Sequence, residues 1–146
     1  MAKKTAREKQ LDTLLRIRRL QEDLAKGELA KANAATRAAY GRLEASRATY
    51  ATEVVPPQTC DVAGFRAHLA RMNSVAGMVR GAERGVETAE EDAAAARVEV
   101  AQRRVKSQGL ERLVDNVRAA AFAEMLAADQ RTAEESRAGV RPKGAR

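Results

Sequence analysis

The sequence is poor in the side chains from which most proteins build a core. Its 146 residues include no Trp, two Tyr, two Phe and one His, whereas 32 are Ala. A globular core needs bulky apolar side chains, because its stability scales with the area removed from water. Alanine buries little area but has the highest helix propensity. Together with 32% charged residues, this composition predicts long helices in a coiled coil.

Proline is also scarce, and it interrupts the chain at one internal place, Pro56–Pro57; the third proline, Pro142, lies near the C-terminus. A proline inside a helix costs about 3 kcal/mol, so the proline-free stretches are the expected helices. We expect Asp61, with Thr59 as the alternative, to cap the second helix. The sequence thus predicts a single coiled-coil domain, 1–146, with a helix over about 5–52, a turn over about 53–61, a second helix over about 62–138 and a basic tail over 139–146.

Apolar residues recur in both helical stretches at steps of three and four, the spacing of a left-handed coiled-coil seam. In the first stretch the expected seam runs through Ile17, Leu20, Leu24, Leu29, Ala32, Thr36, Ala39, Leu43, Ser46 and Tyr50. In the second it runs through Val62, Phe65, Leu69, Met72, Ala76, Val79, Val86, Ala93, Val100, Leu110, Leu113, Val117 and Ala120. A short turn makes consecutive helices antiparallel neighbours. The predicted fold is therefore all-α, a two-helix antiparallel left-handed coiled-coil hairpin with the second helix longer than the first.

The unequal helices predict an overhang. If the turn centres on residue 57, residue i faces about residue 114 − i, and residues 113–138 have no partner within the chain. An apolar stripe with no partner in its own chain is typical of a binding surface. In this overhang the apolar row consists of Leu113, Val117, Ala121 and Met125, with Phe122 and Leu126 beside it.

Positive charge gathers at the same end. Residues 1–20 carry seven Lys or Arg against two acids, and residues 131–146 carry five against two, out of a total net charge of +7. This pattern favours docking to an acidic partner. Nucleic acid is less favoured because the chain has few aromatic side chains to stack on bases.

Residues for catalysis or metal binding are missing from the sequence. His68 is the one histidine and Cys60 the one cysteine, so neither a Ser/His/Asp set nor a Cys/His metal cluster can be assembled. We expect no enzymatic activity, no cofactor, no metal and no small-molecule substrate. The lone cysteine and the absence of a secretory or transmembrane run predict a cytoplasmic location.

Two short stretches of the second helix resemble a known family. "KSQGLERL", residues 106–113, is similar to its Lys-x-x-x-Leu-x-x-Leu stretch with Glu before the second Leu, and "ADQRTAEES", residues 128–136, to its closing acidic pattern. With the length, the single break and the basic ends, the chain resembles the FliJ-type flagellar export proteins, a type III export ATPase stalk family. The motif residues carried over are Lys106, Leu110, Glu111, Leu113, Gln130, Glu134 and Glu135.

The resemblance implies a role in the flagellar type III export apparatus during flagellum assembly. It implies a rod-like stalk that inserts its terminal end into the hexameric export ATPase ring, promotes ring assembly and coupling to the export gate membrane protein, and helps handle export chaperones. It also implies a location at the inner face of the cell membrane, at the flagellar basal body. The residues expected to bind the ring are Arg7, Arg16, Arg18, Arg19, Leu113, Val117, Arg118, Phe122, Met125, Leu126 and Arg131.

Other functions share the predicted fold. An injectisome-type secretion ATPase stalk has the same architecture. A self-associating coiled-coil scaffold would pair the overhang with its own copy, and a nucleic-acid-binding protein would place phosphate at the basic ends, with binding that falls steeply with salt.

Overall fold

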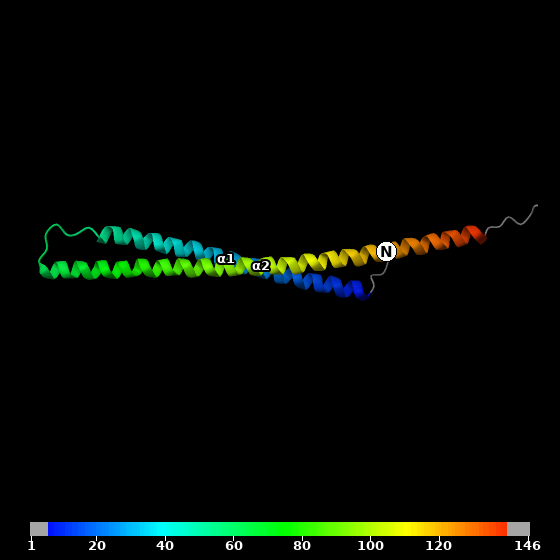
Figure 1. The fold of residues 1–146 in the computed structure, drawn as a ribbon, viewed down its shortest axis with the longest axis horizontal. Helices are drawn as coiled ribbons and strands as arrows, with labels where there is room; N and C mark the ends of the chain where they lie inside the picture. The colour runs from blue at the N-terminus through cyan, green and yellow to red at the C-terminus, as the bar shows by residue number, and fades with distance from the viewer. Residues whose placement is uncertain (1–5, 140–146) are drawn as a thin grey trace, which may run out of the picture. The chain divides into compact units, whose positions relative to one another are not determined.

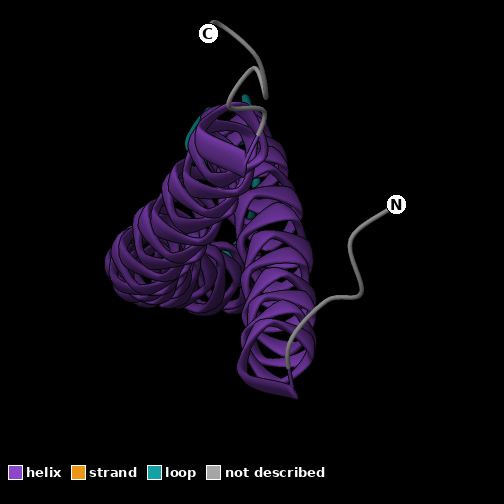
Figure 2. Cartoon of the chain, turned by 90° about the vertical axis from the view of Figure 1, so that its right-hand side faces the viewer, coloured by secondary structure: helices purple, strands orange, loops and turns teal. Residues whose placement is uncertain are grey.

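Two helices account for nearly all of the described chain. The computed structural model describes residues 6–139, which form α1, Ala6–Glu53, and α2, Val62–Gly139, joined by a loop (Figure 1). The helices have 48 and 78 residues, and the described part of the chain contains only helix and loop (Figure 2). The predicted all-α hairpin with a longer second helix is confirmed. Of the expected basic tail, residues 140–146 lie outside the described residues, as do residues 1–5.

Local side-chain chemistry ends α1 and begins α2 on either side of the two prolines. The Val54 amide still donates a helical hydrogen bond to the Tyr50 carbonyl, at 2.9 Å. At the start of α2 the Asp61 carboxylate accepts a hydrogen bond from the Gly64 amide, at 2.7 Å. This is the geometry of an N-cap, in which the side chain satisfies an amide that has no intrahelical partner. The prediction that Asp61 caps the second helix is confirmed.

The chain divides into two compact units, each containing part of both helices. The loop unit comprises Gln21–Arg103. The terminal unit comprises Met1–Leu20 and Arg104–Arg146, of which residues 6–20 and 104–139 are described. In each unit the segments of α1 and α2 lie antiparallel.

The loop unit has its core at the predicted seam. Ala39, Leu43 and Val86 are buried together, with Val79, Ala82 and Ala89 packed around them. The Thr36 hydroxyl lies 3.0 Å from the carbonyl oxygen of Ala89 on the other helix. Such a close approach of side chain to backbone is allowed because most of the neighbouring side chains are small. The expected seam from Leu29 to Tyr50 is confirmed, as it is at Val86, Ala93 and Val100.

The predicted seam at the start of α2 is wrong. Val62, Phe65 and Leu69 are exposed, and His68 and Val75 are buried instead. The reason is the level at which α1 ends: Glu53, its last residue, forms an ion pair with Arg71 across 3.7 Å. The first turns of α2 therefore extend past the end of α1, and the stripe through Phe65 has no helix to face.

The terminal unit is held by a second short seam and by ion pairs across it. Leu15, Ser107 and Val114 are buried, and the Ser107 hydroxyl lies 3.4 Å from the carbonyl oxygen of Arg18. The Arg19 guanidinium binds Glu111 at 2.8 Å, and Arg118 binds Asp12 at 2.7 Å.

These pairs correct the predicted register. A turn centred on residue 57 would place Arg19 opposite residue 95, whereas it pairs with Glu111. The numbers in that pair sum to 130, so the pairing centres near residue 65, because the first turns of α2 extend past the end of α1. Continuing from the Asp12–Arg118 pair, Ala6 lies level with about residue 124. Measured from the described residues of α1, the overhang therefore begins near Met125, and the prediction that it begins at residue 113 is wrong.

The seam predicted at the N-terminal side of α1 is also wrong. Ile17, Leu20 and Leu24 are exposed, at 45%, 56% and 71%. The confirmed seam, from Leu29 to Tyr50, continues toward the N-terminus at the same spacing. There it runs through polar residues such as Arg18 and Glu22, which are half-buried. The prediction was wrong because it assigned the seam to the more apolar face of α1, which lies beside the face that packs against α2.

Candidate functional site

The described residues contain no constellation for metal binding. Within residues 6–139, no group of three or more His, Cys, Asp or Glu side chains gathers so that it could hold an ion. His68 is buried in the second turn of α2, and Cys60 is exposed in the loop. Neither described helix is long and apolar enough to cross a membrane. The remaining candidate sites are surfaces.

The first candidate surface is the overhang of α2 together with Phe122, which lies in the turn just before it. Phe122, Met125 and Leu126 are exposed by 58%, 42% and 45%. Arg131 is exposed beside them, and its side chain donates a hydrogen bond to the Ala127 carbonyl at 3.2 Å. Of the residues predicted to contact the ring, these four lie together on one helix. No described part of α1 lies beside Met125 or the residues that follow it.

The other predicted contact residues fall into the paired part of the terminal unit. Val117 is half-buried in the seam, and Leu113 is 45% exposed beside it. Arg19 and Arg118 form ion pairs with Glu111 and Asp12. Their charges are thus already matched within the chain, so they add less attraction to a partner than a free cation would.

The remaining predicted cations differ from one another in their surroundings. Arg7 and Arg16 are exposed, whereas Arg18 is half-buried at the seam. Neither Arg7 nor Arg16 forms an ion pair with any of residues 6–139. These two arginines therefore remain available to an acidic partner.

The prediction missed three exposed apolar residues of α1 in this unit. Leu14, Ile17 and Leu20 are exposed by 49%, 45% and 56%; the sequence had placed Ile17 and Leu20 in the seam and passed over Leu14. The signal was present in the spacing: a seam carried back from Ala39 in steps of three and four reaches Leu15, which is buried. Leu14 and Ile17 then fall outside it.

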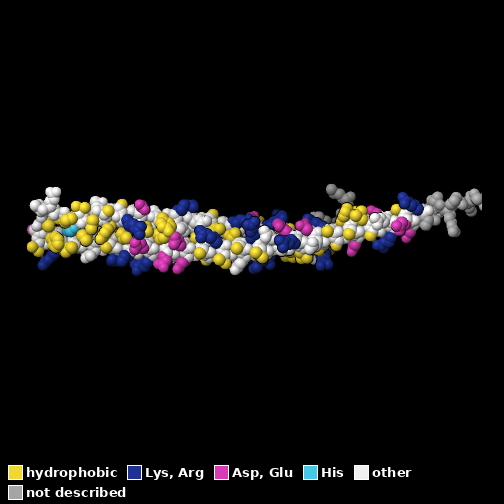
Figure 3. Space-filling model, turned by 45° about the horizontal axis from the view of Figure 1, so that its top comes forward, with side chains coloured by type: hydrophobic (Ala, Val, Ile, Leu, Met, Phe, Trp, Pro, Cys, Tyr) yellow, Lys and Arg dark blue, Asp and Glu magenta, His cyan; other side chains and the backbone are white. Residues whose placement is uncertain are grey.

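A second candidate surface lies at the loop end of the loop unit. Figure 3 shows apolar and uncharged side chains gathered there, and the exposed residues include Val54, Val55, Val62, Phe65 and Leu69. This patch follows directly from the first turns of α2 extending past α1. Most of the exposed bulky apolar side chains of the loop unit lie in this patch, close together in the sequence.

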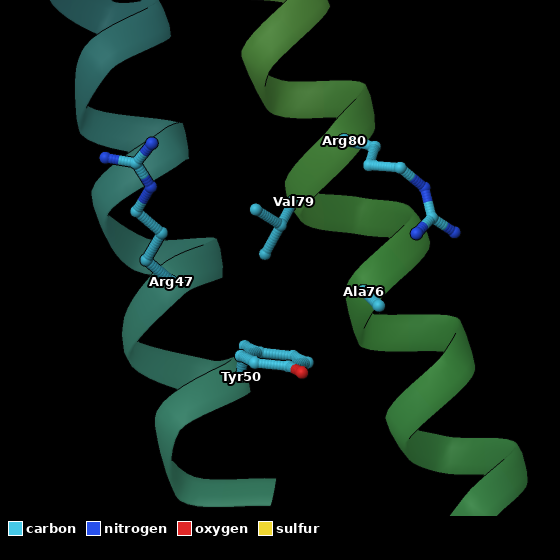
Figure 4. Close-up of a pocket in the computed structure, with 5 residues that line it drawn as sticks. All are labelled: Arg47, Tyr50, Ala76, Val79 and Arg80. Atoms are coloured by element: carbon cyan, nitrogen blue, oxygen red, sulfur yellow. The ribbon is translucent and has the colours of Figure 1, made fainter. Parts of the chain in front are cut away.

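A shallow groove of about 250 Å³ lies on one side of the seam near that end. It is lined by Arg47, Tyr50, Ala76, Val79 and Arg80, and Figure 4 shows the Tyr50 ring reaching from α1 toward α2. Further along this side, Arg47 binds Glu83 at 3.1 Å and the Tyr40 hydroxyl donates a hydrogen bond to Glu90. That hydrogen bond raises the pKa of Tyr40 above its ordinary value.

The family-motif residues occupy different environments. Leu110 is half-buried in the seam and Glu111 binds Arg19. Lys106 and Leu113 are exposed on the terminal unit. Exposed positions on the overhang are held by Gln130, Glu134 and Glu135. One part of the motif thus holds the helices together, and the rest faces solvent.

Comparison with known proteins gives one match. The model of the family described as flagellar FliJ protein matches residues 7–138. No curated protein and no solved structure matches the chain. The match spans both helices and the loop between them, including the motif in α2. The chain therefore belongs to the flagellar FliJ protein family, whose members are non-catalytic components of flagellar export.

Proposed function

We propose that this protein is a stalk that inserts its terminal end into the hexameric export ATPase ring and couples the ring to the export gate. The observation that carries the proposal is the overhang of α2. Met125–Gly139 continues past the described start of α1, and its exposed apolar residues have no partner from α1. A single helix that leaves a hairpin with bulky apolar side chains on its surface fits insertion into a cavity lined by other chains.

The distribution of positive charge also favours the terminal unit as the part that binds the ring. Arg7, Arg16 and Arg131 are exposed there, and the sequence adds further Lys and Arg to both termini. Complementary charge speeds association and excludes wrong partners, whereas the buried apolar contacts provide most of the affinity. The apolar residues of the overhang are therefore the expected anchors, and the arginines orient the stalk.

The loop end is then left for other contacts. We assign the patch around Phe65 and Leu69 to the export gate membrane protein or to export chaperones, because it lies on the unit that does not carry the overhang. A stalk with both contacts promotes ring assembly and places the protein at the inner face of the membrane.

The experiment is the steady-state rate of the cognate export ATPase with the full chain, with Phe122→Asp and with Val98→Asp. The two side chains are matched, because Phe122 is 58% exposed and Val98 is 57% exposed. Burial of a Phe side chain contributes about 1.5–3 kcal/mol. Phe122→Asp is therefore expected to raise the concentration of the protein required for half-maximal stimulation about tenfold or more. Val98→Asp is expected to stimulate like the unaltered chain.

Circular dichroism of both variants controls for helix content. Full stimulation by Phe122→Asp at the same concentration as the unaltered chain would exclude this end of α2, the overhang and the turn before it, as the ring contact. Equal loss in both variants would show that the contact is not localised at the overhang.

A further inference from the structure

The paired part of the terminal unit has two unlike sides. One side carries the ion pairs Arg19–Glu111 and Asp12–Arg118. The other side carries exposed apolar residues: Leu14 is 49% exposed and Leu113 is 45% exposed, and Ile17, 45% exposed, adjoins Leu14 three residues further along the surface of α1. This second side is a different surface from the overhang, since it lies where both helices are present.

The helical spacing places Leu14 and Leu113 on the same side of the pair. Leu14 directly precedes the buried seam residue Leu15, and Leu113 directly precedes the buried seam residue Val114. Each leucine therefore lies about 100° around its helix axis from its seam residue, in the direction of the preceding residues. Arg19 and Arg118 follow the same two seam residues by four positions, which turns them about 40° the other way. In an antiparallel pair, equal rotations on the two helices lead to the same side, so the ion pairs and the leucines lie on opposite sides.

Two cations complete the apolar side. Arg7 precedes Leu14 by seven residues and Lys106 precedes Leu113 by seven, so each shares the side of its leucine. Both are exposed, and neither has an ion-pair partner among the residues that the structure describes. We name Arg7, Leu14, Ile17, Lys106 and Leu113 the terminal flank.

Acidic side chains of this paired segment lie elsewhere. Asp12 and Glu111 are in the ion pairs, and Asp115 follows Glu111 by four residues and shares its face. Glu8 is half-buried at the seam and has a partner of its own. Glu124 is the exception: it is exposed, follows Val117 by seven residues and so lies on this side near the Arg7 end. The terminal flank therefore has an apolar centre bordered by Arg7 and Lys106, with one carboxylate near Arg7.

We propose that the terminal flank binds an acidic amphipathic helix of a partner protein. A third helix fits along two packed helices by placing its apolar residues against Leu14, Ile17 and Leu113, in the manner of helix-in-groove recognition. Its flanking carboxylates would then meet Arg7 at one end and Lys106 at the other. The proposal goes beyond the ring contact, because it concerns a different surface and its test does not use the ATPase.

Other occupants fit this flank less well. A second copy of the chain would bring Arg7 and Lys106 against like charges, which is unfavourable in a contact that excludes water. A lipid surface is bound by helices with aromatic anchors, and the terminal flank has none.

The test uses the full chain and a synthetic helical peptide of about three heptads, with Leu at the seam positions, Glu at the flanking positions and Ala elsewhere. A second peptide has Lys in place of each Glu. Binding is measured by fluorescence anisotropy of the labelled peptide at low and high salt. We expect the acidic peptide to bind, the basic peptide not to bind, and added salt to weaken the complex.

Two pairs of variants locate the contact. Ile17→Asp is expected to weaken binding about tenfold or more, whereas Val98→Asp, at an exposed apolar position of the loop unit, leaves it unchanged. Lys106→Glu is expected to weaken binding severalfold. Arg104→Glu makes the same change of charge two residues away, but Arg104 precedes Glu111 by seven residues and so lies on the ion-pair side. It is expected to have the smaller effect.

The proposal is overturned if neither peptide binds, if both bind equally, or if Ile17→Asp and Val98→Asp have the same effect. Self-association in sedimentation that Ile17→Asp abolishes would assign the flank to a second copy. Binding of the chain to phosphatidylglycerol vesicles that Ile17→Asp abolishes, without peptide binding, would assign it to a lipid surface. None of these outcomes alters the ATPase measurement with Phe122→Asp, so the two proposals fail separately.

Discussion

Three glycines in α2 lead to a prediction about stability. Gly77, Gly81 and Gly85 follow one another at four-residue spacing inside the helix. A Cβ atom built at any of the three meets no atom within 4 Å, so alanine would cause no steric conflict. Glycine in a helix interior costs about 0.8–1 kcal/mol relative to alanine, because its backbone loses more freedom on folding. Replacing all three by alanine should therefore raise the free energy of unfolding by about 2.5–3 kcal/mol.

Thermal unfolding followed by circular dichroism at the helical band measures the effect. For a chain of this size, about 1 kcal/mol corresponds to about 2–4 °C, so the triple variant should melt about 5–12 °C above the unaltered protein. Urea unfolding provides an independent value, since the midpoint should rise while its slope stays unchanged. Each single variant should contribute about a third of the total, because the sites do not contact one another.

Gly64→Ala is the matched control. This glycine is also in α2, but a Cβ atom there would lie 3.1 Å from the Asp61 carboxylate oxygen and 3.2 Å from the Cys60 Cβ atom. It would disturb the cap that begins the helix, so the same chemical change should give no stabilisation. A triple variant no more stable than the unaltered chain would refute the reasoning, as would equal stabilisation by Gly64→Ala.

Two further predictions test the loop unit. Leu43→Ala should lower the free energy of unfolding by about 2–4 kcal/mol, because Leu43 is 7% exposed in the core with Val86; Val98→Ala, at an exposed site, should change it by less than about 0.5 kcal/mol. Urea unfolding of both variants checks this, and equal effects would contradict the assigned core. Glu90→Gln should lower the pKa of Tyr40, because the hydrogen bond to Glu90 raises it. The raised pKa favours the protonated phenol in the folded state, so its stabilisation is complete below the unfolded pKa of about 10 and is lost as pH rises through the folded value. Absorbance titration of the phenolate in a Tyr50→Phe background reports this shift, and an unchanged Tyr40 titration in Glu90→Gln would contradict it.

The core of the loop unit was predictable because its pattern is long and regular. The stripe from Leu29 to Tyr50 keeps the spacing of three and four without interruption, and its members are buried or half-buried. The pattern failed where bulky residues lie beside a polar seam. Ile17 and Leu20 are more apolar than Arg18, yet Arg18 lies at the seam, since the helix keeps one face toward its partner even when that face becomes polar.

The candidate binding surface was predicted in composition but not in extent. Met125 and Leu126 are exposed on the overhang, and Phe122 is exposed just before it, as the sequence indicated. Val117 is not, because the register shifts the paired region toward the C-terminus of α2. Arg7 and Leu113 were predicted as contact residues, but the terminal flank was not recognised as one surface. Leu14 and Leu113 are 99 residues apart in the sequence and become neighbours on one side only through that register.

The sequence by itself determined the number, type and limits of the helices, because these depend on local chemistry. Alanine-rich stretches favour helix, Pro56 and Pro57 prevent it, and Asp61 starts it again at the next residue. Only the tertiary structure decided which residues meet. The register depends on the level at which Glu53 ends α1 beside Arg71, and on contacts such as Arg19–Glu111, which join residues 92 apart in the chain. Such contacts follow from packing along the whole seam, and no local stretch of sequence specifies them.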